Sequence, residues 1–153
     1  NPILNDEIKG TFMMCFQEYM KRSGSVLVNT HQLSLDNVWV NDMYAGEYNP
    51  AHFHSSKSSL VGLSSVLFLK VPDTYGEEYT NSHTPANGHL EFIGGSQHSL
   101  AISQMRVSPE VGDFFIFPYT LVHTVYPFRQ TEQMRRTLSY NCDLFPKVMV
   151  KPT

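Results

Sequence analysis

The chain has 153 residues, of which 41% are hydrophobic and 16% charged, and these proportions predict one globular domain over residues 1–153. A formal net charge of −3 argues against nucleic acid as a partner, because there is no excess of basic residues to neutralise phosphates. We also expect no membrane partner and a cytoplasmic location, because no apolar run reaches the ~18 residues of a membrane span and no signal peptide is visible.

The first predicted element is a helix over residues 3–22, within an N-terminal segment that covers residues 1–24. Its apolar residues recur every three or four positions and therefore lie on one side: Ile8, Phe12, Cys15, Phe16 and Tyr19. Gly24 is typical of the position just after a helix. Because only one side of the helix is apolar, we expect it to pack on the outside of a sheet. The distant Cys15 and Cys142 are predicted to be free thiols.

After residue 24 the apolar pattern changes to a period of two, which predicts a β-rich core over residues 25–150. The predicted strands cover residues 25–31, 35–44, 52–55, 60–71, 88–93, 105–107, 113–117, 122–127, 134–142 and 147–150. The polar loop over residues 73–87 is long enough to be functional, and we consider it a candidate lid. Because no further helix alternates with these short strands, the pattern predicts a mainly β sandwich or jelly roll.

Two of the seven histidines, His52 and His54, are separated by one residue. In an extended segment both side chains point to the same face and can bind one ion, although an exposed pair without a ligand is an equal alternative. His123 follows an apolar segment, where an unpaired buried imidazole would be unfavourable. A metal ion shared by His52, His54 and His123 would satisfy all three, and neutral imidazoles suit Fe(II), Zn or Cu.

The strand after His123 carries alternating polar residues. One face has Arg135, Thr137, Ser139 and Asn141, and the other has Met134, Arg136, Leu138 and Tyr140. An arginine followed two residues later by a hydroxyl can bind a carboxylate. The alternative is that this polar face is solvated and that Leu138 and Tyr140 lie in the core. Alternation alone does not distinguish the two arrangements.

Residues 36–142 resemble the 2-oxoglutarate/Fe(II)-dependent oxygenases, above all a small group of 2OG-Fe(II) oxygenases seen in bacteria, phages and marine viruses. The motifs that carry the resemblance are WVN (39–41), YAG (44–46), NPAHFH (49–54), LFLKVP (67–72), GHLEF (88–92), PEVGD (109–113), FP (117–118), LVH (121–123) and RRTLSYN (135–141). It is their order and spacing that is specific. The resemblance implies a double-stranded β-helix, the jelly roll of cupins, in a bacterium or a phage-infected host cell.

The resemblance also implies roles for single residues. His52 and His123 would be iron ligands, and Arg135 with Thr137 would bind the distal carboxylate of 2-oxoglutarate. Tyr44 would contribute a hydrogen bond to this cosubstrate. Arg135 fits the Arg-x-Ser/Thr motif better than Arg136, and Arg129 is a weaker candidate. Most of the superfamily has Asp or Glu at the position of His54, which implies a third imidazole ligand or a replacement by water or Glu91.

The activity implied by the resemblance is that of a non-haem Fe(II)- and 2-oxoglutarate-dependent dioxygenase. It would use O2 to hydroxylate a small-molecule or protein substrate and release succinate and CO2. Two alternatives stay open: a cupin-like three-histidine metalloenzyme that does not use 2-oxoglutarate, and a non-catalytic jelly-roll binding module. The sequence does not identify the substrate, and it is compatible with a homo-oligomer.

Overall fold

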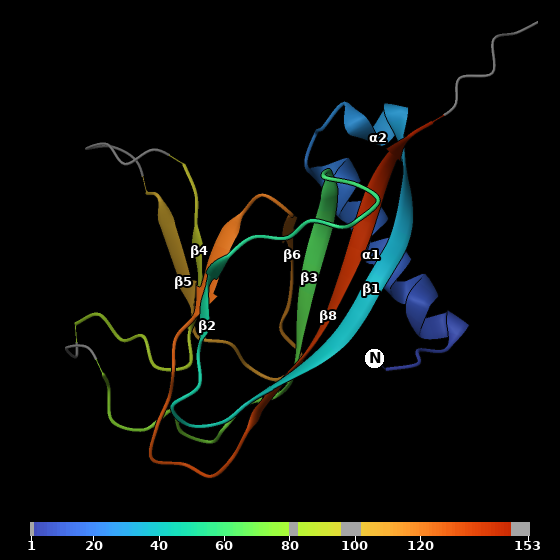
Figure 1. The fold of residues 1–153 in the computed structure, drawn as a ribbon. Coiled ribbons are helices and arrows are strands. Elements are labelled where there is room, and N and C mark those ends of the chain that lie inside the picture. Colours follow the sequence, from blue (N-terminus) through green and yellow to red (C-terminus); the bar gives the residue numbers. More distant parts are fainter. Residues whose placement is uncertain (1, 80–82, 96–101, 148–153) are drawn as a thin grey trace, which may run out of the picture.

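The computed structural model describes residues 2–79, 83–95 and 102–147. Two four-stranded antiparallel sheets face each other, and a long helix lies outside one of them (Figure 1). The strands are β1 (His31–Met43), β2 (Asn49–His52), β3 (Gly62–Lys70), β4 (Leu90–Ile93), β5 (Gln104–Val107), β6 (Phe114–Pro118), β7 (Val122–Val125) and β8 (Arg135–Pro146).

The strand order identifies the fold. The first sheet, sheet A, has the order β1-β8-β3-β6, and the second, sheet B, has the order β2-β7-β4-β5. In each sheet an early strand thus lies beside a late one, β1 beside β8 and β2 beside β7, as in a jelly roll or double-stranded β-helix. The predicted mainly β fold is confirmed.

The N-terminal helix α1 (Asp6–Arg22) begins after Asn5, whose side chain accepts a hydrogen bond from the Ile8 N–H at 2.8 Å. Its buried residues, Phe12, Phe16 and Met20, pack on the outer face of sheet A, as predicted. Cys15 and Cys142 are both free thiols. No helix in the described part of the chain is long and apolar enough to cross a membrane.

Strand β8 is buried on both faces, which resolves the alternatives left open by its alternation. Leu138 and Tyr140 point outward and join the core beneath α1. Arg135 and Thr137 point between the sheets, where they are 2% and 5% exposed. The space between the sheets is therefore polar along β8, and the helix rather than the sandwich interior covers its apolar residues.

The strand predicted for residues 25–31 is wrong, because residues Leu27–Thr30 form the short helix α2. Ser25 favours this turn: its hydroxyl accepts a hydrogen bond from the Leu27 N–H at 3.2 Å, and its carbonyl accepts one from Val28 at 3.2 Å. Local bonds of this kind compete with a strand ladder. Strand β1 instead starts at His31 and is continuous, with a bulge between Leu35 and Val38.

The strand predicted for residues 52–55 is also misplaced, because β2 covers Asn49–His52 and leaves His54 outside the strand. The other element boundaries differ less. Strand β8 extends to Pro146, beyond the predicted end at residue 142. Of the strand predicted for residues 147–150, only Lys147 is described. Its N–H donates to the Thr30 carbonyl at 2.8 Å outside any strand, and residues 148–150 lie outside the described residues.

The first part of the 73–87 loop is tied to the segment that leads into β8. The Asp73 N–H donates to Gln133 Oε1 at 2.7 Å, and the Glu77 N–H donates to Gln130 Oε1 at 2.7 Å. Arg129 adds a bond from its Nε to the Glu77 carbonyl at 2.6 Å. These bonds tie Asp73 and Glu77 to residues 129–133, and a lid role of the loop stays a prediction.

Candidate functional site

Three histidines meet between the two sheets. His52 is the last residue of β2, and His123 lies directly opposite it in β7. His54 follows two residues after the end of β2, and its main-chain N–H donates to the Tyr119 carbonyl at 2.9 Å. One ring nitrogen from each of the three lies within 4.8 Å of the others. The structure thus brings together the three residues predicted to form a metal site.

Backbone carbonyls determine which ring nitrogen of two histidines is free. His52 Nδ1 lies 2.7 Å from the Pro50 carbonyl oxygen, and His123 Nδ1 lies 3.0 Å from that of Leu121. Because a carbonyl can only accept, Nδ1 carries the proton in both rings. The lone pair of each imidazole is therefore on Nε2. This is the arrangement of metal-ligating histidines that are oriented by a second hydrogen bond.

The spacing of two of the nitrogens fits one ion. His54 Nε2 lies 3.2 Å from His123 Nε2. Two imidazole nitrogens at ~2.1 Å from the same ion would be about 3.0 Å apart at a right angle and about 3.4 Å apart at a tetrahedral angle. The observed distance falls between these two values. The His54 and His123 nitrogens therefore fit Fe(II) or another divalent ion that accepts nitrogen ligands, and His52 lies close enough to be a third candidate ligand.

The histidines are held in the form that binds a metal. Burial, followed by the charges of His123 and His52, lowers the pKa of His54 to about 4. Burial also lowers the pKa of His123, although the hydrogen bond to the Leu121 carbonyl partly offsets it. Both imidazoles are therefore neutral at neutral pH, so that an ion does not have to displace a proton from either ring.

We expect the metal-free protein to lose stability as the pH falls from about 6.5 towards 4. In this range the unfolded chain binds protons at His54 and His123 that the folded chain does not bind, so unfolding is favoured at lower pH. The free energy of unfolding in urea, measured at several pH values, tests this. His54→Gln should flatten the pH dependence; the same slope in both proteins would contradict the expectation.

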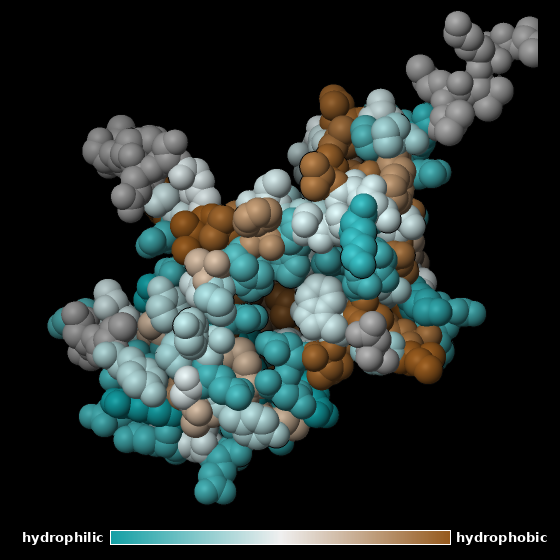
Figure 2. Space-filling model, in the orientation of Figure 1, coloured by the Kyte–Doolittle hydropathy of each residue, from teal (hydrophilic) through white to brown (hydrophobic). Residues whose placement is uncertain are grey.

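A cavity of about 60 Å³ adjoins the histidine cluster. Sheet B contributes His52 and His123 to its wall, and β8 contributes Arg135 and Thr137. Figure 2 shows a hollow on the same face as Figure 1, between the sheets, with mostly hydrophilic and neutral residues around it and hydrophobic ones at its bottom. The predicted polar face of β8 thus lines the same space as the predicted metal ligands.

Arg135 is a buried cation without an anionic partner among the described residues. It is 2% exposed, and its Nε has no hydrogen-bond partner in the described part of the chain. Its nearest groups are Met43 Sδ, 3.6 Å from Nη1, and the Phe68 ring, whose centroid lies 4.7 Å from the guanidinium carbon. Burial lowers the pKa of Arg135 to about 10, which leaves it charged at neutral pH. A buried, unpaired charge of this kind is unfavourable unless an anionic ligand binds to it.

The other two candidate arginines already have partners. Arg136 lies on the opposite face of β8 and forms two bonds of 2.7 Å to the carboxylate of Asp42. The guanidinium of Arg129 bonds to the Glu77 carbonyl and lies over the Tyr79 ring, 4.5 Å from its centroid. Of the three, Arg135 is the one that faces the histidine cavity.

The structure does not bring two other predicted residues to the cluster. The Tyr44 side chain is outside the cavity wall, and the residue is 51% exposed. Glu91, considered as a replacement for His54, is buried elsewhere. Its carboxylate binds Arg106 at 3.0 Å and accepts a hydrogen bond from the Tyr126 hydroxyl at 2.5 Å. Among the residues that the structure describes, no carboxylate joins the three histidines in the cluster.

Trp39 and Asn41 also line the cavity, although the sequence pattern predicted no role for either side chain. The pairing of β1 with β8 places Trp39 opposite Ser139 and Asn41 opposite Thr137. Their spacing of two residues predicts that they share a face. Which face this is follows only from the pairing of β1 with β8.

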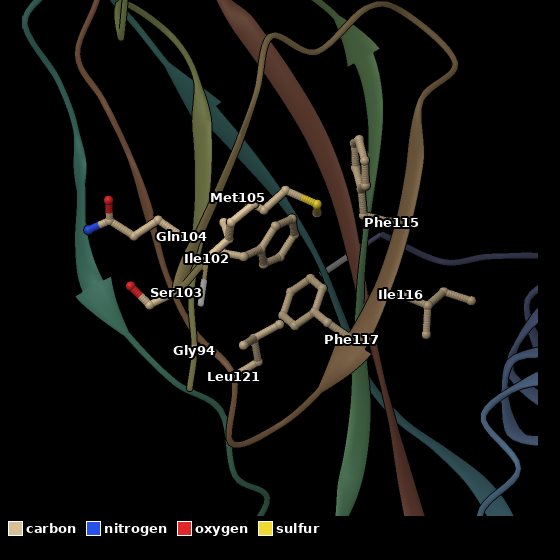
Figure 3. Close-up of a pocket in the computed structure, with 10 residues that line it drawn as sticks. Gly94, Ile102, Ser103, Gln104, Met105, Phe115, Ile116, Phe117 and Leu121 are labelled. Atoms are coloured by element: carbon tan, nitrogen blue, oxygen red, sulfur yellow. The ribbon is translucent and has the colours of Figure 1, made fainter. Parts of the chain in front are cut away.

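Aromatic rings close the other side of the cluster. The Phe117 ring centroid lies 4.7 Å from that of His123, and that of Phe92 lies 6.2 Å away. Both rings also line an apolar cavity of about 300 Å³ between β6 and the β4–β5 edge, with Leu121 and Met105 (Figure 3). Phe117 is thus a wall shared by the two cavities, and it limits access of water to His123 from this edge.

The described geometry can be compared with known proteins. The family described as "Putative 2OG-Fe(II) oxygenase" matches residues 37–141. No curated protein matches the sequence significantly. An oxidoreductase of the 2OG-Fe(II) oxygenase family from Burkholderia pseudomallei is similar in structure, with 14% identity and a TM-score of 0.53. The match covers 83% of this chain and 50% of that one, so this chain spans half the length of that protein.

Two further solved structures are less similar. A non-haem monooxygenase, ThoJ, in complex with nickel has a TM-score of 0.46 at 13% identity, over 88% of this chain and 67% of that one. An RmlC-like cupin from Desulfovibrio desulfuricans has a TM-score of 0.39 at 15% identity, over 74% of this chain and 82% of that one. The family match, in contrast, includes the three histidines and Arg135 and extends over more than half of the sequence. The chain therefore belongs to the 2OG-Fe(II) oxygenase family.

Proposed function

We propose that this protein is a non-haem Fe(II)- and 2-oxoglutarate-dependent dioxygenase. His52, His54 and His123 would hold Fe(II), and Arg135 would bind the distal carboxylate of 2-oxoglutarate. The observation that carries the proposal is the buried, unpaired guanidinium of Arg135 in the same cavity as the three histidines. A metal site alone would not require such a cation, whereas a dicarboxylate cosubstrate would neutralise it.

The chain's own residues would bind and orient the reactants. Three neutral imidazoles would leave the full charge of a divalent ion uncompensated, which favours anionic ligands at its remaining positions. The guanidinium of Arg135 presents several donors to the far carboxylate, and the neighbouring Thr137 offers a hydroxyl. The Fe(II) centre, when bound, would supply O2 activation for the decarboxylation of 2-oxoglutarate to succinate and CO2 with hydroxylation of a substrate. Phe92 and Phe117 would exclude water from the side of His123.

The substrate is proposed only by class. A small molecule or a protein side chain could approach the cluster through the hollow between the sheets, which Trp39 and Asn41 flank on β1. An indole ring offers a flat apolar surface and a carboxamide offers one donor and one acceptor. These two residues are therefore the ones that we expect to contact the substrate.

Anaerobic addition of Fe(II) and 2-oxoglutarate tests the proposal. We expect a weak visible absorption band, because a 2-oxo acid bound to Fe(II) through its keto group gives a charge-transfer transition. Fe(II) alone, or Zn(II) with 2-oxoglutarate, should give no band and serves as the control. Absence of the band in a folded protein loaded with Fe(II) would exclude 2-oxoglutarate as cosubstrate.

The histidine at position 54 favours one second candidate, a cupin-like three-histidine metalloenzyme that does not use 2-oxoglutarate. Under this alternative, Fe(II) binds to the same three imidazoles, but the visible band is absent and Arg135 is dispensable for activity. A non-catalytic jelly-roll module would instead show no stoichiometric metal. The visible band together with the stoichiometry of bound Fe(II) therefore separates all three possibilities.

A further inference from the structure

We propose that Asp143 is a positioning residue for His54, acting through Tyr119 and Ser56. The inference rests on the proposed metal site and concerns how its third ligand is held. His52 and His123 lie in the β2–β7 ladder, where they are direct partners. His54 lies outside any strand, and one main-chain bond, from its N–H to the Tyr119 carbonyl, connects it to the sandwich. The position of the His54 imidazole therefore depends on Tyr119 and on the turn that follows His54 in the chain, which contains Ser56.

Asp143 connects both of these segments. It lies on β8, on the face that points between the sheets, and is 2% exposed. The Tyr119 hydroxyl donates to Asp143 Oδ1 at 2.9 Å, and the Ser56 hydroxyl donates to Oδ2 at 2.8 Å. Each carboxylate oxygen thus binds one of the two segments next to His54, which are the segment with Tyr119 and the turn with Ser56. No lysine or arginine of the described residues forms an ion pair with Asp143.

The two segments are in turn rigid. Tyr119 is 1% exposed, its N–H donates to the Gly62 carbonyl at 2.9 Å, and its ring occupies the space that a Cβ at residue 62 would fill. The Ser56 hydroxyl also accepts from the main-chain N–H groups of Ser58 at 3.0 Å and Ser59 at 2.8 Å. A shift of Asp143 would therefore move both neighbours of His54 together.

The carboxylate of Asp143 is better explained by a role in positioning His54 than by a role in filling the core. A buried carboxylate is unfavourable unless its oxygens are bonded, and an apolar residue would fill the same space at lower cost. What the carboxylate adds is two charge-assisted hydrogen bonds of defined direction. Metal ligands must be held to within about 0.5 Å for a productive geometry, and groups behind the ligands commonly supply this.

Metal affinity tests the inference through a double-mutant cycle. Co(II) affinity is measured by calorimetry for the wild type, Asp143→Asn, His54→Ala and the double variant. An amide has one acceptor oxygen in place of two, so we expect Asp143→Asn to weaken Co(II) binding about 10- to 100-fold. If Asp143 acts through His54, it should have no further effect in the His54→Ala background. The same loss in both backgrounds would overturn the inference.

A second readout needs no metal. Hydrogen exchange of the His54 amide, which donates to Tyr119, should be faster in metal-free Asp143→Asn than in the wild type. Unchanged exchange of this amide would contradict the inference. If the wild type itself does not bind Co(II), the proposed metal site is wrong, and the exchange result still decides whether Asp143 positions residue 54.

A matched pair of tyrosines controls for general destabilisation. Tyr119 and Tyr126 each donate a hydroxyl bond to a buried carboxylate, that of Asp143 and that of Glu91 respectively. Tyr119→Phe should weaken Co(II) binding and speed exchange at His54, whereas Tyr126→Phe should do neither. Equal effects of the two would show that the loss reflects stability alone. If Asp143→Asn does not fold, Tyr119→Phe and Ser56→Ala provide the same test.

Discussion

Replacing His123 with alanine is expected to abolish stoichiometric Fe(II) binding. His123 is 6% exposed, its Nε2 faces His54, and its Nδ1 is already bonded to the Leu121 carbonyl. Removal of a ligand should cost more than the 10- to 100-fold loss that is typical for a group behind a ligand, so we expect a loss of at least about 100-fold. Calorimetric titration with Fe(II) under anaerobic conditions, or with Co(II), measures this.

His31 provides the control for this prediction. It lies at the start of β1, and its Nδ1 contacts the hydroxyl of Thr30. It belongs to no cluster of metal-binding residues among those the structure describes. His31→Ala should therefore bind Fe(II) with unchanged affinity. Equal loss in both variants, or retained binding in His123→Ala, would exclude the three-histidine site.

Replacing Arg135 with methionine is expected to abolish 2-oxoglutarate binding and to leave Fe(II) binding intact. The Arg135 guanidinium brings a positive charge to the wall of the cavity. Its hydrogen bond goes to Met43 and not to the three histidines, so their positions should not change when it is removed. The same substitution should raise the free energy of unfolding by about 1–3 kcal/mol, because it removes a buried charge that has no anionic partner among the described residues of the ligand-free protein. A residue that decreases stability while it enables binding is typical of a functional site.

Two measurements on Arg135→Met are needed. The visible band on addition of 2-oxoglutarate to the Fe(II) protein reports binding, and urea unfolding of the metal-free protein reports stability. Arg136→Met is the matched control, because it breaks an exposed ion pair with Asp42, and exposed ion pairs contribute little to stability. It should keep the band. Normal 2-oxoglutarate binding by Arg135→Met would refute the assigned role and favour the three-histidine alternative.

These two variants together separate the parts of the proposal. Loss of metal in His123→Ala with normal metal in Arg135→Met would show that the cavity has two independent binding functions. Loss of both functions in both variants would indicate that the variants disturb the fold, which unfolding measurements detect. Separating metal binding from cosubstrate binding matters because His54 stands where the superfamily usually has a carboxylate. Three neutral imidazoles would bring no negative charge to the metal, and the anionic cosubstrate would then supply it.

The sequence by itself predicted the mainly β class, the outer helix and the grouping of the three histidines, which the structure brings together. These features depend on short-range patterns: the change of apolar period after Gly24, the His-x-His spacing and the order of the motifs. Local patterns were insufficient where local and long-range interactions compete. For residues 25–31 the hydrogen bonds of Ser25 formed a short helix where apolar alternation predicted a strand.

Only the tertiary structure decided which face of β8 lines the histidine cavity. Both faces are buried, one by α1 and one by sheet B, so burial preference could not separate Arg135 from Arg136. The pairing of β8 with β1 and β3 sets the face, and it depends on residues about a hundred positions apart in the chain. The same long-range packing placed Glu91 with Arg106 and Tyr126, and brought Asp143 to the two segments that flank His54. Residue types and spacing therefore identified the chemistry, and the packing of the sheets selected the side chains that can perform it.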